Sequence, residues 1–258
     1  MTPEHFIEPT GWPDDAHRDR FIGDWLLYQR RGGHRTSTDD LLTAWFGVRA
    51  MRGKTPARYL DLGCGIGSVL LMVAHRLRPN LSVGVEAQAQ SALLASRSIA
   101  ELPEPPPISV HHADLRALEA LRLAPFELIT GSPPYFPLGT GVLPPDAQRR
   151  ACRFELRGGV EAYCAAASPL LAPGGALALV FPTAGDSRVL AAAAESRLTL
   201  RARADVKMRV GRAAPFLTLY ELRHEAGPLE QLGFCVRDAQ GELTAEYRAV
   251  REALGLPS

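Results

Sequence analysis

The sequence predicts an α/β protein with a mostly parallel sheet that is closed near its C-terminal end by an antiparallel hairpin. From Arg58 onward, short apolar runs typical of buried strands alternate with segments of helical periodicity. Later, two strand-like segments, Thr199–Val210 and Phe216–Glu221, are joined by a connection that suffices for a hairpin and is too short for a crossover helix. The chain of 258 residues, 46% of them hydrophobic and 22% charged, has the size and balance of one enzyme-sized domain.

The elements of this sheet can be placed in order along the chain. We expect strands at Tyr59–Leu62, Leu81–Glu86, Ile108–His112, Phe126–Thr130 and Ala176–Phe181. We expect helices at Val69–Leu77, Gln88–Ala100, Leu115–Leu121, Glu155–Leu171 and Ser187–Ser196. With the hairpin these strands make a seven-stranded sheet with an antiparallel edge. A long loop, about Phe136 to Ala151, interrupts the alternation, and loops of this length in compact domains are often functional.

Two further segments flank this sheet, so the sequence predicts three parts. Residues 1–57 form an N-terminal extension that we expect to be helical around Arg20–Tyr28 and Asp39–Met51. Residues 58–224 form the main domain, and residues 225–258 a polar helical appendage. The start, Met1–Glu8, lacks the basic and apolar character of a signal peptide, and no apolar run approaches the roughly 20 residues that span a bilayer. We therefore expect a cytoplasmic protein without membrane contact.

Cysteine and histidine give no sign of a metal site. The four cysteines are widely scattered without a Cys-x-x-Cys pair, which favours neither a disulfide framework nor a zinc ribbon. His34, His111 and His112 have no metal-like partners in the sequence, and we interpret them as solvated loop residues.

A glycine-rich loop lies where the first strand turns into a helix. The segment Asp61-Leu62-Gly63-Cys64-Gly65-Ile66-Gly67 lets a ligand lie against the backbone and the helix N-terminus. Its spacing is G-x-G-x-G, and Ser68 stands where the dinucleotide fingerprint G-x-G-x-x-G needs its last glycine. The next two strands end near Glu86, with Ala87 beside it, and near Asp114, followed by Leu115.

Three acids at successive strand ends would repel a pyrophosphate and would suit an adenosine carrying a cationic tail. This motif order resembles that of S-adenosylmethionine (SAM) dependent methyltransferases from about Tyr28 through Glu221. The resemblance implies a Rossmann-like class I fold with SAM as cofactor. It further implies that Asp61 and the Gly63–Gly67 backbone hold the methionine part, Glu86 the ribose hydroxyls, and Asp114 with Leu115 the adenine.

A rigid diproline loop follows the fourth strand. In Gly131-Ser132-Pro133-Pro134-Tyr135 the prolines fix the backbone and leave its carbonyls free to accept hydrogen bonds. The loop resembles the (Asn/Asp/Ser)-Pro-Pro-(Tyr/Phe/Trp) motif of amino-methyltransferases. The resemblance implies that Ser132 and the carbonyl of Pro133 accept from the target amine, that Pro134 sets the turn and that Tyr135 stacks on the base. Serine here is common among cytosine-N4 enzymes, whereas adenine and glutamine enzymes mostly have Asn or Asp.

The N-terminal extension points to one family of these enzymes. The stretch Tyr28 to Leu42, with its Thr38-Asp39 pair, resembles the segment before the SAM domain of bacterial tRNA(Val) adenine-N6 methyltransferases. Pro133-Pro134-Tyr135-Phe136 and Ala151-Cys152-Arg153-Phe154-Glu155 match this family too. We expect Thr38 and Asp39 either to cap a helix facing the methionine end of SAM or only to start that helix.

The substrate implied by this resemblance is an RNA, with tRNA first. Arg30, Arg31 and Arg35 are expected at the cofactor mouth, where RNA phosphates could dock, and Tyr135 with Phe136 would stack on a flipped base. Three alternatives stay open: methylation of rRNA adenine, of DNA cytosine N4, or of a protein glutamine. A non-catalytic SAM-binding scaffold is a further alternative, against which the intact diproline loop argues.

Overall fold

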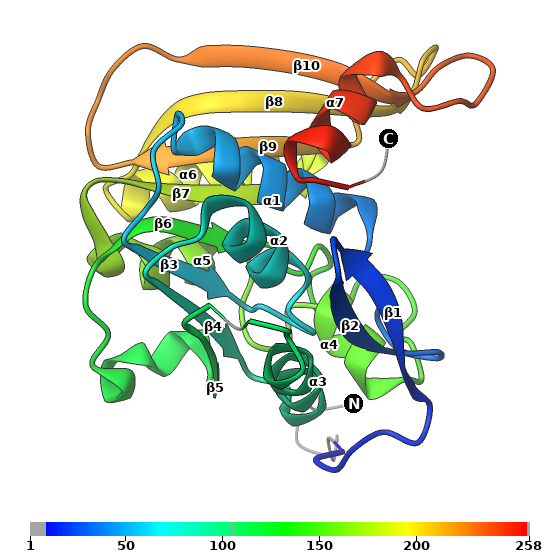
Figure 1. Cartoon of the computed structure of the whole chain (residues 1–258). Helices are drawn as coiled ribbons and strands as arrows, with labels where there is room; N and C mark the ends of the chain where they lie inside the picture. Colours follow the sequence, from blue (N-terminus) through cyan, green and yellow to red (C-terminus); the bar gives the residue numbers. More distant parts are fainter. Residues whose placement is uncertain (1–8, 105, 257–258) are drawn as a thin grey trace.

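The computed structural model describes residues 9–104 and 106–256 and confirms the α/β architecture (Figure 1). Residues 1–8, which carry the signal-peptide argument, lie outside the described residues. The strands of the main sheet are β3 (Arg58–Leu62), β4 (Leu81–Glu86), β5 (Ile108–His112), β6 (Phe126–Gly131), β7 (Leu171–Pro182), β8 (Thr199–Arg209), β9 (Leu217–Arg223) and β10 (Glu230–Arg237). Among the described residues, every helix is too short or too polar to cross a membrane.

The strand order explains where a ligand can bind. In the described residues the sheet has eight strands in the order β10-β8-β9-β7-β6-β3-β4-β5. Strands β3 to β7 pair in parallel, and the chain builds outward from β3 first through β4 and β5 and then through β6 and β7. The carboxyl ends of β3 and β6 therefore lie beside a topological switch point, where open α/β sheets bind their ligands.

Helices cover both faces of this sheet (Figure 1). One face carries α1 (Thr38–Ala50), α2 (Ser68–Leu77), α3 (Ala89–Ala100) and α7 (Ala245–Ala253), and the other carries η2 (Leu115–Leu121), α5 (Val160–Ala167) and α6 (Asp186–Glu195). The remaining helices are α4 (Ala147–Arg153) and two short turns, η3 (Ser168–Leu170) and η4 (Thr183–Gly185). Each face buries its own apolar cluster, with Phe46 and Leu70 in the first and Val160 and Val189 in the second.

The expected helix over Arg20–Tyr28 is wrong. This segment belongs to an antiparallel hairpin of β1 (Ala16–Ile22) and β2 (Trp25–Arg30). Gly23, with a φ of 58°, and Asp24 form a two-residue loop that pairs Ile22 with Trp25. Burial alternates along β2, which is the period of a strand. The second expected helix, Asp39–Met51, is confirmed as α1.

Three more expectations need correction. The C-terminal tail is only partly helical, because β10 extends the main sheet in parallel with β8 before α7 begins, and its alternating apolar residues fit an edge strand. The expected antiparallel edge is an interior strand, since β9 lies between β7 and β8. The expected helix Glu155–Leu171 begins late, at Val160, because Gly158 has a φ of 94° and Gly159 is the N-cap.

Candidate active site

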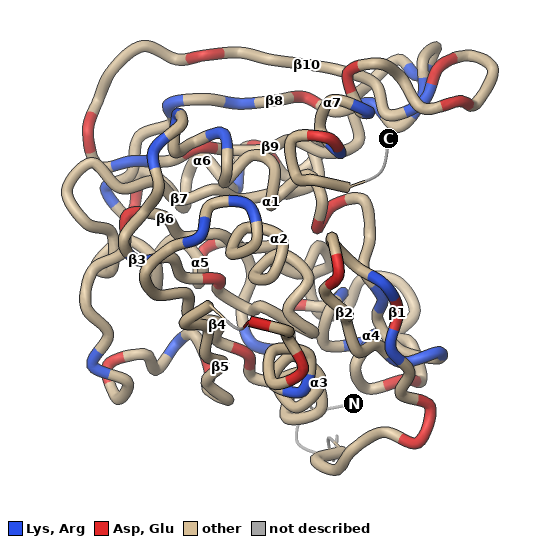
Figure 2. The backbone as a smooth tube through the Cα atoms, viewed as in Figure 1, with Lys and Arg blue, Asp and Glu red and all other residues tan. Residues whose placement is uncertain are grey.

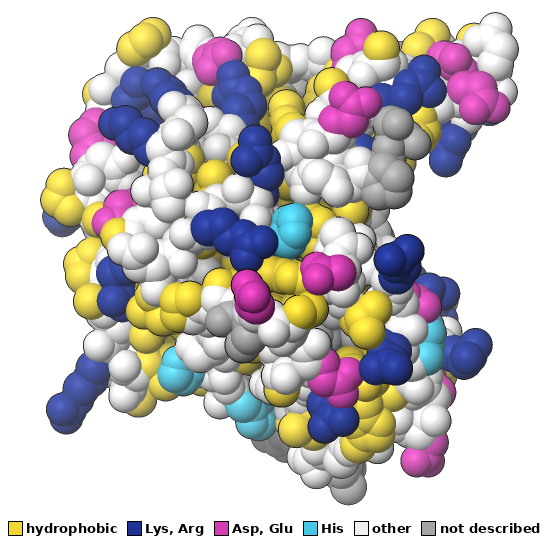
Figure 3. Space-filling model, viewed as in Figure 1, with side chains coloured by type: hydrophobic (Ala, Val, Ile, Leu, Met, Phe, Trp, Pro, Cys, Tyr) yellow, Lys and Arg dark blue, Asp and Glu magenta, His cyan; other side chains and the backbone are white. Residues whose placement is uncertain are grey.

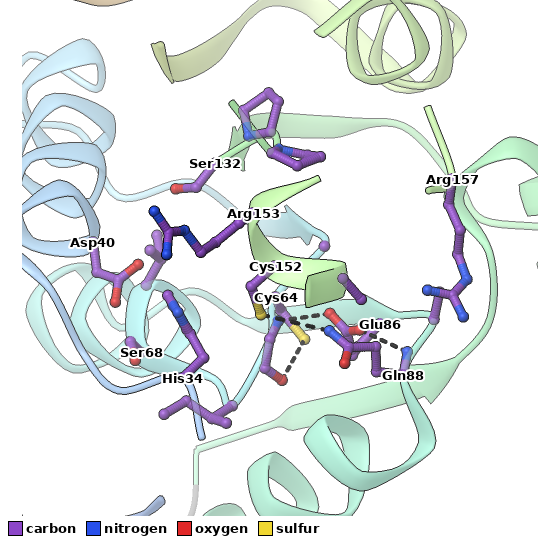
Figure 4. Close-up of a pocket in the computed structure, with 18 of the residues that line it drawn as sticks. His34, Asp40, Cys64, Ser68, Glu86, Gln88, Ser132, Cys152, Arg153 and Arg157 are labelled. Atoms are coloured by element: carbon purple, nitrogen blue, oxygen red, sulfur yellow. Dashed lines mark hydrogen bonds between the residues drawn. The ribbon is translucent and has the colours of Figure 1, made fainter. Parts of the chain in front are cut away.

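A cavity of about 530 Å³ opens at the carboxyl ends of β3, β4 and β6. Most residues predicted for the site line it: Arg31, Arg35, Asp39, Asp61, Gly63, Cys64, Gly65, Glu86, Ala87, Asp114, Leu115, Ser132, Pro133, Pro134, Tyr135 and Phe136. Thr38, Gly67 and Arg30 do not line it. Figure 4 shows Asp40, Glu86 and Ser132 around the same space, although they come from three distant segments.

Asp61 presents an unsatisfied oxygen at the end of β3. Its carboxylate is 2% exposed, and Oδ1 accepts a hydrogen bond of 2.6 Å from the hydroxyl of Thr130. The hydroxyl of Tyr59 lies 2.7 Å from Thr130 and, since the proton of Thr130 is engaged, donates to it. Oδ2 of Asp61 has no hydrogen-bond partner among the described residues. Burial raises the pKa of Asp61 to about 7, so a cationic ligand group would favour its ionised form.

The glycine loop allows a ligand to approach the backbone. Gly63 has a φ of 63°, and a Cβ there would lie 2.1 Å from the hydroxyl of Tyr163. Gly65 has a φ of 55°, and a Cβ there would meet no atom within 4 Å. Tyr163, which sequence reasoning missed, therefore fits against Gly63, while the space beside Gly65 stays open. Gly67, with a φ of 90°, serves as the N-cap of α2.

The acids at the ends of β4 and β5 are fixed in different ways. Glu86 is 6% exposed, and its two oxygens accept hydrogen bonds from the backbone amides of Gly65, at 2.8 Å, and Gln88, at 2.6 Å. Asp114 caps η2, and its hydrogen bonds with Arg116 lower the pKa of this carboxyl. Glu86 thus fastens the glycine loop to the end of β4.

The first turn of α1 adds two further carboxylates. The N-cap is Ser37, so Thr38 and Asp39 start the helix without capping it. Asp40 accepts a hydrogen bond of 3.0 Å from the amide of Ser37, and burial, with the charge of Asp39, raises the pKa of Asp40 to about 8. The inner wall of the cavity is therefore rich in carboxylates.

Two hydrogen bonds join α1 to the diproline loop. The hydroxyl of Tyr135 donates to Oδ2 of Asp39 at 2.8 Å, and its ring meets Phe181 edge to face at 5.9 Å. Oγ of Ser132 lies 3.1 Å from the hydroxyl oxygen of Thr43, which itself donates to the carbonyl of Asp39 at 2.8 Å. Helix α1 thus holds both ends of the segment Ser132–Tyr135.

Helix α4 closes the opposite wall, and sequence reasoning placed it in a loop. Its carboxyl end meets the diproline loop, because the carbonyl of Arg153 accepts from the amides of Tyr135 and Phe136. Arg30 lies outside the cavity because its guanidinium is paired with Asp15 and with Asp146, the N-cap of α4. Asp146 and the i, i+4 arginines that follow it were signals of this helix in the sequence.

His34 is a pocket residue and not the solvated loop residue that we expected. Burial lowers its pKa, and the positive charges of Arg149 and Arg153 add to this effect against the opposing charge of Asp39. Figure 4 shows the ring of His34 next to the guanidinium of Arg153. The lowered pKa favours a neutral ring, which can both donate and accept a hydrogen bond.

Comparisons with known proteins find methyltransferases, by sequence and by structure. The tRNA1(Val) (adenine(37)-N6)-methyltransferase of Tolumonas auensis is 30% identical over 226 residues, which are 87% of this chain and 91% of the relative. The protein of the same name from Enterobacter sp. is 29% identical over 93% of this chain and 96% of the relative. A solved structure, a predicted O-methyltransferase from Agrobacterium tumefaciens, shares the fold with a TM-score of 0.59 and 19% identity, covering 86% of this chain and 98% of its own. No protein-family model matches the chain.

The buried carboxylates predict how stability depends on pH. The folded-state pKa values of Asp61, about 7, and Asp40, about 8, lie above the ordinary value of 3.8. Their contribution to stability is complete below that value and is lost as the pH rises through the folded-state values. The free energy of unfolding of the ligand-free protein should therefore fall between about pH 4 and pH 8, as thermal melts across this range would show.

Asp40→Asn removes one of these titrations while keeping an oxygen that can accept from Ser37, so its decline with pH should be shallower. Asp24→Asn, in the exposed hairpin loop, is the matched control and should decline like the wild type. Equal slopes for the Asp40→Asn variant and the wild type would contradict the prediction.

Proposed function

The chain belongs to the tRNA1(Val) (adenine(37)-N6)-methyltransferase family, and we propose that it transfers a methyl group from S-adenosylmethionine to N6 of an adenine in tRNA. One observation carries the proposal: the loop Ser132–Tyr135 lies on the same cavity as the strand-end carboxylates. An amine held by the loop would thus face a ligand held by the acids. A tRNA substrate implies action in the cytoplasm.

The groups that line the cavity are chemically suited to S-adenosylmethionine. The partnerless oxygen of Asp61 fits an ammonium group, and the open side of Gly65 leaves room beside the backbone. Glu86 would hold the ribose, and Asp114 with Leu115 the adenine. When bound, S-adenosylmethionine supplies an electrophilic methyl group on a cationic sulfur, which the surrounding carboxylates favour.

Hydrogen bonds run from Ser132 to Thr43 and from Thr43 to the carbonyl of Asp39, and we call this series the hydroxyl chain. It explains how a serine can replace the Asn or Asp that is usual at this position of the loop. Thr43 gives its proton to the carbonyl of Asp39, so Ser132 must donate its own proton to Thr43. The lone pairs of Ser132 are then available to accept from the target amine, together with the carbonyl of Pro133. Such acceptors orient the amine for attack, and orientation supplies much of the rate acceleration.

Tyr135 completes this arrangement. Its hydroxyl is anchored on Asp39, and burial raises its pKa well above the usual range, which keeps the phenol neutral. An anchored ring loses little entropy when a base stacks on it. Tyr135 and Phe136 are thus proposed to hold the flipped adenine.

The direct test is the transfer of labelled methyl groups from S-adenosylmethionine to unmodified total tRNA, followed by nuclease digestion and mass spectrometry of the nucleosides. We expect N6-methyladenosine as the product. Ser132→Ala, which lacks the acceptor oxygen, should bind the cofactor and give far less product. Label in N4-methylcytidine, or no label in tRNA from a protein that binds the cofactor, would contradict the proposal.

The hydroxyl chain predicts that Thr43 positions Ser132. Thr43→Val keeps the shape of this fully buried side chain and removes its oxygen, so Ser132 loses its proton acceptor. We expect kcat to fall on the order of tenfold, the effect of one hydrogen bond, with little change in the Kd of the cofactor. Thr43→Ser keeps the hydroxyl and should restore most of kcat.

Steady-state kinetics and melting temperatures of both variants check this role. A purely structural role would lower the melting temperature without separating kcat from KM. An unchanged kcat in Thr43→Val would refute the positioning role.

A further inference from the structure

Helix α4 is held as a rigid platform beside the diproline loop. Asp146, its N-cap, is paired with Arg30 of β2 at 2.9 Å. Gln148, only 2% exposed, accepts from the amide of His34 at 3.0 Å and donates to Ser91 of α3 at 2.9 Å. At the other end, the amides of Tyr135 and Phe136 donate to the carbonyl of Arg153 at 3.1 and 3.0 Å. Side chains on α4 therefore have a fixed register relative to the loop that is proposed to hold the base.

One face of α4 presents two exposed arginines to the cavity. Arg149 and Arg153 are spaced i, i+4, so they project from the same side of the helix, and both line the cavity. Among the described residues neither forms an ion pair. Arg150, between them, is buried and donates to the carbonyl of Pro144. The guanidinium of Arg153 lies 5.5 Å from the ring centre of Phe136 and reaches toward the space between Ser132 and His34 (Figure 4).

The arginines that the sequence suggested for phosphate binding are largely engaged elsewhere. Arg30 pairs with Asp15 and Asp146, and Arg35 pairs with Asp19 at 3.0 Å. Figure 2 shows Lys and Arg distributed along the chain with Asp and Glu among them, and Figure 3 shows no single basic patch on the face in view. Cations available to a polyanion at the mouth of the site are thus concentrated on α4, with Arg31 nearby.

The charges that line the cavity indicate where the base and the phosphates of a bound nucleotide would lie. Its inner wall carries carboxylates such as Asp61 and Glu86, which repel phosphate. Both α4 arginines line the same cavity, and Arg153 lies next to Phe136, one of the two rings proposed for stacking. A nucleotide whose base enters between the rings would leave its phosphates near these guanidinium groups, which suit phosphate oxygens by their planar donor fork.

We propose that Arg149 and Arg153 bind the phosphodiester groups that flank the target nucleotide, and thereby hold the flipped base in the site. This inference rests on the proposed function, since it takes RNA as the substrate. It assigns backbone contacts, which position a nucleic acid without reading its sequence, to one face of α4.

The test compares Arg149→Gln and Arg153→Gln with Arg248→Gln. The control removes the same charge from an exposed position of α7, which does not line the cavity. Fluorescence anisotropy gives the Kd for an unmodified tRNA transcript at a series of salt concentrations, and calorimetry gives the Kd for S-adenosylmethionine. Because binding is measured without turnover, a failure of the proposed methylation remains distinguishable from a failure of this inference.

We expect each α4 variant to weaken tRNA binding about tenfold and to reduce the slope of log K against log salt by about 0.7 to 0.9, the share of one phosphate. The control should behave like the wild type, and cofactor affinity should be unchanged in all three. Affinities and slopes of the α4 variants equal to those of the control would overturn the proposal. A loss of cofactor affinity would also overturn it, because the arginines would then serve the cofactor carboxylate.

A second arm uses an RNA hairpin with neutral methylphosphonate linkages on both sides of a loop adenine. The wild type should bind this hairpin about as weakly as the double variant Arg149→Gln, Arg153→Gln binds the unmodified one, because both contacts are lost in each case. On the modified hairpin the single variants should bind little more weakly than the wild type, since the phosphate charges that the arginines contact are already absent. A full additional loss in the variants would show that the arginines contact something other than these phosphates, and would refute the assignment.

Discussion

Burial of carboxylates at the carboxyl end of β3 and in the first turn of α1 is the constraint on which the rest of this site depends. Asp61 and Asp40 are almost fully enclosed, and their pKa values are raised to about 7 and about 8. An ionised carboxylate in such surroundings is costly unless a positive group compensates it. The fold accepts this cost at the switch point of the sheet. There the space beside Gly65 is open, and one oxygen of Asp61 has no hydrogen-bond partner in the described chain.

Two helices that are not part of the β/α alternation, α1 and α4, then fix the position of the diproline loop beside these acids. Helix α1 holds Ser132 and Tyr135 through Thr43 and Asp39. Helix α4 holds the same loop from the other side through the carbonyl of Arg153. Two prolines already stiffen this segment, and both helices hold it by hydrogen bonds. The proposed amine acceptors therefore have little conformational freedom, and methyl transfer requires such a fixed orientation.

Much of this arrangement could be predicted from the sequence, because it depends on local patterns. The strand periodicity, the G-x-G-x-G loop and Ser132-Pro133-Pro134-Tyr135 each contain their own signal. The family resemblance, inferred from these motifs together with the stretch Tyr28 to Leu42, is confirmed by the relatives. The hairpin also had a local signal, the Gly23-Asp24 loop, which the helical interpretation overlooked.

What escaped prediction depends on contacts between distant segments. No local pattern shows that Thr43 meets Ser132, or that Tyr163 packs against Gly63. The expected position of Arg30 at the cofactor mouth was wrong for the same reason, since only the fold brings Asp146 to it. Likewise, β10 joins the sheet through pairing with β8, which sequence periodicity alone does not reveal.

The most direct test of the central claim is the calorimetric affinity of S-adenosylmethionine for the wild type and for Asp61→Asn. The variant keeps an oxygen that can accept from Thr130 and loses the negative charge that we propose binds the cofactor. The affinity of the variant for S-adenosylmethionine should fall by tenfold or more, about 1.4 kcal/mol, while its melting temperature without ligand should not fall. An unchanged affinity would contradict the assignment of the strand-end carboxylates to the cofactor.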